Sequence, residues 1–74
     1  MKAMEFRILL EKLILKDWDR WEKKDRKYIR TVAEKNHIKV VEVPDEGAAL
    51  FYGKPDHLYF FLYDVAYRYD VELV

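Results

Sequence analysis

The fold depends most on how the last part of the chain is interpreted, residues 57–74, HLYFFLYDVAYRYDVELV. Its second half alternates apolar and polar residues, and its Tyr and Val side chains favour a β-strand. The stretch also fits a helix, because Asp64 and Arg68 are spaced to pair on one helix face. No turn-forming residue interrupts it, and a strand of that length would be exceptional. We therefore predict a helix over residues 57–69 and a short strand over residues 71–74, with a β-strand as the alternative.

A β-hairpin is predicted immediately before this segment. Residues 38–43, IKVVEV, are rich in β-branched side chains, which favour strands. Pro44 and Gly47 mark a turn, because proline fixes its own φ angle and glycine accepts unusual backbone angles. Residues 48–52 can return as the second strand, and a second turn over residues 53–56 leads into the C-terminal segment.

The first part of the chain is predicted to be helical. No glycine or proline precedes Pro44, and apolar residues recur at spacings of three and four over residues 3–15. A second helix is predicted over residues 18–36, since Asn36 tolerates the left-handed conformation that ends helices. The predicted fold class is therefore α+β, with two N-terminal helices, a hairpin, an aromatic-rich helix and a short final strand. We expect residues 1–74 to form a single small domain.

Composition limits the chemistry that this chain can perform. It contains no Ser, Cys or Gln, and its only small uncharged polar side chains are Thr31 and Asn36. The usual nucleophiles and thiolate ligands are therefore missing, and the two glycines stand too far apart for a phosphate-binding loop. His37 and His57 could serve as metal ligands or as acid and base, but their positions match no ligand motif. We expect a protein that is not an enzyme and that uses no catalytic residue, cofactor, metal or small-molecule substrate.

The source and location of the protein can also be predicted. Abundant Lys, Glu and Arg beside few amide side chains and no Cys are typical of proteins from thermophiles, in which ion-pair networks become relatively more favourable. The N-terminus lacks the pattern of a secretory signal. No apolar run approaches the ~20 residues of a membrane-spanning helix. We expect a cytoplasmic protein with no membrane partner.

The first hypothesis for function is self-association, or binding to another protein. A helix over residues 57–69 would be apolar almost all round, and so small a domain could not bury all of it. Large aromatic side chains typically dominate binding energy at protein interfaces. The candidate interface residues are Trp18, Trp21, Tyr59, Phe60, Tyr63 and Tyr67.

The second hypothesis is nucleic-acid binding by the basic half of the chain. Residues 1–35 carry 11 Lys and Arg against 7 Asp and Glu, whereas residues 36–74 carry 3 against 7. The cations at helical spacing are Lys16, Arg20, Lys23, Lys27 and Arg30. Two helices followed by a hairpin also resemble the winged helix-turn-helix in architecture. The alternative is a solvated helix face paired with nearby carboxylates, which the zero net charge favours.

Asp25 is the one acidic residue within the apolar side of the second predicted helix. It falls between Trp21 and Tyr28. A carboxylate there is costly unless it is paired or lies at the rim. We expect a structural role, such as a bond to an indole N–H, a tyrosine hydroxyl or a cation of another subunit.

Overall fold

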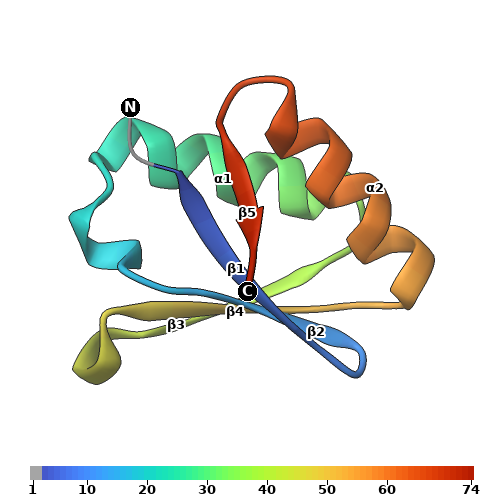
Figure 1. The fold of residues 1–74 in the computed structure, drawn as a ribbon, viewed down its shortest axis with the longest axis horizontal. Helices are drawn as coiled ribbons and strands as arrows, with labels where there is room; N and C mark the ends of the chain where they lie inside the picture. The colour runs from blue at the N-terminus through green and yellow to red at the C-terminus, as the bar shows by residue number, and fades with distance from the viewer. Residues whose placement is uncertain (1–2) are drawn as a thin grey trace.

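The computed structural model describes residues 3–74 and shows a five-stranded mixed sheet with two α-helices on one of its faces (Figure 1). The elements in chain order are β1 Met4–Leu9, β2 Lys12–Leu15, the 3₁₀ turn η1 Trp18–Arg20, α1 Lys23–Lys35, β3 Lys39–Val43, the 3₁₀ turn η2 Pro44–Glu46, β4 Ala48–Tyr52, α2 Pro55–Ala66 and β5 Val71–Leu73. The strand order is β3-β4-β2-β1-β5. Only the β1–β5 pair among these strands is parallel.

The predicted helix over residues 3–15 is wrong, because this stretch forms the antiparallel hairpin β1–β2. Alternate residues of its strands enter the core, namely Met4, Phe6, Leu13 and Leu15. Leu9 and Ile14 are also apolar but lie on the opposite face, so the period-two pattern is masked. The turn between the strands holds Glu11 at φ 58°, a left-handed conformation more typical of glycine or asparagine. The sequence therefore contains no conventional signal for this turn.

The second predicted helix is present but shorter than residues 18–36. A 3₁₀ turn occupies residues 18–20, and α1 begins at Lys23 after Glu22, whose backbone is extended. The end is close to the prediction, since Asn36 is the residue that terminates the helix. The left-handed conformation expected of Asn36 belongs instead to His37, at φ 60°. The predicted order of two N-terminal helices before a sheet is therefore wrong, although the fold remains α+β.

The C-terminal half agrees with the sequence prediction. Residues 39–43 and 48–52 pair as an antiparallel hairpin, connected by the turn that contains Gly47 at φ 61°. Helix α2 follows over Pro55–Ala66 rather than over the predicted residues 57–69, and the strand alternative for this segment is wrong. A short loop then brings β5 beside β1, where the backbone N–H of Val74 donates to the carbonyl of Phe6.

The core lies between the sheet and the two helices. Three phenylalanine rings form its centre, with centroid distances of 6.0 Å from Phe6 to Phe51, 6.0 Å from Phe6 to Phe61 and 5.0 Å from Phe51 to Phe61. All three are fully buried, and burial of each such side chain contributes about 1.5–3 kcal/mol. No element of residues 3–74 covers the other face of the sheet (Figure 1).

Candidate interaction surfaces

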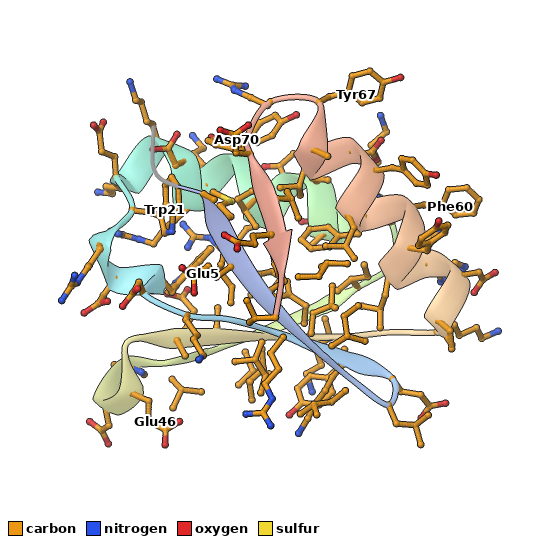
Figure 2. All side chains as sticks on the ribbon, viewed as in Figure 1. Glu5, Trp21, Glu46, Phe60, Tyr67 and Asp70 are labelled. Atoms are coloured by element: carbon orange, nitrogen blue, oxygen red, sulfur yellow. The ribbon has the colours of Figure 1, made fainter. Side chains whose placement is uncertain are left out.

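The outer side of α2 carries an exposed row of aromatic residues. Exposed fractions are 60% for Tyr59, 58% for Phe60, 56% for Tyr63 and 91% for Tyr67. Figure 2 shows Phe60 and Tyr67 directed away from the body of the fold. These residues are exposed because the sheet covers only one side of α2, the side on which Phe61 is buried.

Aliphatic residues of the β1–β2 hairpin extend this surface. A groove of about 590 Å³ lies between the hairpin and α2, and Glu11 is the only charged residue in its lining. Exposed fractions in the hairpin are 52% for Ile8, 37% for Leu9 and 90% for Leu10. A second groove of about 300 Å³ shares the Tyr59 side chain and continues along α2 to β5. We call the combined surface the aromatic band, which consists of Ile8, Leu10, Tyr59, Phe60, Tyr63 and Tyr67.

Two tyrosines of the band interact with each other. The rings of Tyr59 and Tyr63 meet edge to face, with centroids 5.0 Å apart. The spacing is that of one helical turn, which places the two side chains side by side on α2. A hydrogen bond with Tyr59 and charge interaction with its phenol raise the pKa of Tyr63 above its usual value. The Tyr63 phenol therefore stays neutral at physiological pH.

The two tryptophans predicted for the interface have internal roles. Trp18 is only 3% exposed, and its indole N–H donates to the Glu42 carboxylate over 2.9 Å. Trp21 is half-buried and packs against Tyr69, with centroids 5.9 Å apart. The helix prediction had placed both residues on one long amphipathic helix, whereas the 3₁₀ turn directs Trp18 toward Phe51 in the core.

Asp25 forms a structural contact of the kind expected. Its carboxylate accepts a 2.6 Å hydrogen bond from the Tyr69 hydroxyl. Burial and this bond to a carboxylate raise the pKa of Tyr69 to about 12. Tyr28 packs on the same ring, at 6.0 Å between centroids, and Arg68 lies 4.3 Å from the Tyr28 ring. These contacts hold the loop between α2 and β5 against α1.

The five cations of the predicted basic stripe do not share one helix. Lys16 follows β2 and Arg20 lies in η1, so that only Lys23, Lys27 and Arg30 belong to α1. The first predicted helix is a hairpin, and the arrangement that resembled a winged helix-turn-helix is therefore absent from residues 3–74. Nucleic-acid binding through these five residues stays a prediction. The continuous row on one helix, on which it was based, is not present in the part of the chain that the structure describes.

Two cations of the stripe have partners within the fold. Arg20 Nε lies 3.9 Å from a carboxylate oxygen of Asp17. Arg30 Nη1 lies 3.3 Å from the Glu42 carboxylate, and its guanidinium lies 5.9 Å from the Trp18 ring centroid. Exposed ion pairs of this kind contribute little to stability and need no functional explanation.

The structure brings together the two histidines that the sequence separates. The rings of His37 and His57 lie 5.6 Å apart between centroids, because the end of α1 and the start of α2 are adjacent. Within residues 3–74, no group of three or more His, Asp or Glu side chains is arranged to hold a metal ion. The sequence could not indicate that the two histidines are close, because their proximity depends on the sheet topology, which was not predicted.

Comparison with known proteins gives no relative from which a function could be transferred. No protein-family model matches the chain, and neither a curated protein nor a solved structure matches it. Among the helices of residues 3–74, none has both the length and the apolar character needed to cross a membrane. The function must therefore be inferred from the surfaces.

Proposed function

We propose that this chain is a non-enzymatic module of the cytoplasm that self-associates through the aromatic band. The observation that carries the proposal is the exposure of four large aromatic residues along one side of α2 and its C-cap residue Tyr67. Soluble proteins rarely expose a contiguous apolar surface of this kind without a binding role. Tyr and Phe are also residues that are enriched in the centres of protein interfaces.

The area of the band supports an interface of ordinary size. An enclosed Phe or Tyr buries about 150–250 Å², so exposed fractions of 60, 58, 56 and 91% leave roughly 400–650 Å² of aromatic surface. The hairpin residues Ile8 and Leu10 add to this. A standard interface buries about 800 Å² on each partner, whereas the largest patch on a typical monomer is about 300–600 Å². The complete band therefore approaches the size that a stable dimer needs.

The absence of charge from the band favours a second copy as the partner. In a two-fold symmetric dimer each residue near the axis meets its own counterpart, so a charged residue there would face the same charge. None of the band residues is charged, and Glu11 is the only charged residue that lines its two grooves, although 38% of the chain is charged. A surface of neutral phenols and aliphatic side chains can pack against its copy without repulsion or buried ions.

Sedimentation velocity tests the proposal from low micromolar to submillimolar protein. We expect the weight-average mass to rise from monomer to dimer with concentration. Tyr63→Arg should weaken association by at least about thirtyfold, since truncating or blocking a central aromatic residue costs about 2 kcal/mol or more. The matched control is Tyr52→Arg on the far face of the sheet, which should associate like the wild type. A strictly monomeric wild type, or equal effects of the two variants, would contradict the proposal.

A further inference from the structure

The uncovered face of the sheet has an aromatic residue with a lysine on each side of it. Strand register pairs Leu9 with Lys12, Lys12 with Tyr52, and Tyr52 with Lys39, which makes one row across four strands. Directly paired residues point to the same face of a sheet. The residue before Tyr52, Phe51, is fully buried beneath the helices, so this row lies on the opposite, open face.

The aromatic ring and its neighbours are accessible. Tyr52 is 37% exposed, and Lys12 Nζ lies 5.8 Å from its ring centroid. Lys39, which pairs with Tyr52 from the neighbouring strand β3, is exposed as well. Side chains extend from the sheet on the side away from both helices in Figure 2. Tyr52 therefore offers a ring for stacking, with the Lys12 ammonium group over it and Lys39 paired with it on the neighbouring strand β3.

The next row provides an apolar floor and a third cation. It consists of Arg7, Ile14, Leu50 and Val41, paired in that order across β1, β2, β4 and β3. The three aliphatic residues are half-buried and Arg7 is exposed. Neither row contains an acidic residue. The paired acids of this region, Glu5 and Glu72, lie on β1 and β5 beyond the second row, and Glu11 lies in the hairpin turn beside Lys12.

Charge identifies the class of partner for this face. A second copy packed symmetrically here would bring Arg7, Lys12 and Lys39 against cations of the same kind, which is unfavourable. A polyanion would instead neutralise all three. A duplex hides its base faces within its stack, whereas a single strand presents both phosphates and the flat base surfaces that pack on exposed aromatic rings.

We propose that the open face of the sheet binds single-stranded nucleic acid, with Tyr52 stacking on a base and Arg7, Lys12 and Lys39 contacting phosphates. The aliphatic floor accommodates the neighbouring bases. The contact is sequence-tolerant, because every base has a π-face and the cations contact only the backbone. The three cations set a weak, salt-dependent affinity. This proposal does not depend on self-association, since the face lies opposite the core from α2.

Fluorescence anisotropy with dye-labelled oligo(dT) and oligo(rU) tests the proposal. Both should bind at low salt, and log affinity should fall against log salt with a slope of about −2, since each neutralised phosphate contributes about −0.7 for single strands. Tyr52→Ala should weaken binding about 5- to 150-fold, whereas Tyr52→Phe should retain it. Lys39→Gln should reduce the salt slope to about −1.4.

Matched controls separate this face from the helix side. Lys27→Gln removes an exposed cation of α1 and should leave affinity unchanged, and circular dichroism should show all variants folded. Duplex of the same length should bind more weakly than the single strand. The proposal is overturned if neither oligonucleotide binds at low salt, if Tyr52→Ala binds like Tyr52→Phe in a folded protein, or if Lys27→Gln weakens binding as much as Lys39→Gln. Stronger binding to duplex would overturn it too.

Discussion

Removal of the Tyr69 hydroxyl should destabilise the protein measurably at neutral pH. The hydroxyl donates over 2.6 Å to the Asp25 carboxylate. A hydrogen bond to a charged group contributes about 1.5–3 kcal/mol, and partial exposure of this pair reduces the expected loss in Tyr69→Phe to about 1–2 kcal/mol. For a domain of this size, such a loss corresponds to a fall in Tm of roughly 4–16 °C.

The same contact predicts how stability changes in alkali. The pKa of Tyr69 is raised to about 12 in the folded protein from an ordinary value of 10.0. The folded state therefore holds this proton more strongly than the unfolded state, and the stabilisation is complete below pH 10. It declines as the pH rises from 10 to 12, because the unfolded chain then releases a proton that the folded chain retains. Two pKa units correspond to about 2.7 kcal/mol, which solvent screening at this half-buried site reduces to about 1–2 kcal/mol.

Urea denaturation followed by circular dichroism measures both effects. We expect the difference in unfolding free energy between wild type and Tyr69→Phe to be largest near neutral pH and to shrink between pH 10 and 12. Tyr67→Phe is the matched control, because its side chain is 91% exposed and should show neither effect. Equal stability of Tyr69→Phe and wild type at neutral pH, or a difference that stays constant into alkali, would refute this account of the Asp25 contact.

Two further substitutions test the core and the β3–β4 turn. Phe61→Ala should lower the free energy of unfolding by about 3–5 kcal/mol, measured by urea denaturation, because it removes a fully buried ring from the centre of the core. Gly47→Ala should cost about 1–2 kcal/mol, since φ is 61° and the new Cβ would lie 2.8 Å from Asp19 Oδ1. Gly53→Ala, which lacks the positive φ angle, should lower Tm less, and the opposite order in thermal melts would contradict the turn geometry.

The C-terminal half could be predicted from the sequence because its turns are made by residues with restricted or unusual backbone preferences. Pro44 and Gly47 mark the hairpin turn, and Pro55 occupies the first turn of α2. The N-terminal hairpin offered no such marker. Its turn places Glu11 in a left-handed conformation, a local cost that the buried strand residues offset through tertiary packing.

The candidate surfaces were predictable to different degrees for a related reason. The exposure of Tyr59 and its neighbours follows from helix geometry and domain size, both of which the sequence specifies. Trp18 was assigned to the wrong environment because its position depended on an unbroken helix. The row formed by Lys12, Tyr52 and Lys39 depends on strand register between distant segments, which no local pattern encodes.

The two proposed surfaces would act together in a way that neither achieves alone. Three phosphate contacts and one stacking ring give weak binding per copy. A dimer formed through the aromatic band would carry two open faces, so a strand long enough to reach both would bind the second face at a high effective concentration. Tyr63→Arg should therefore leave affinity for a short oligonucleotide unchanged and weaken affinity for a long one. Equal affinity of wild type and variant for the long strand would mean that the two faces act independently.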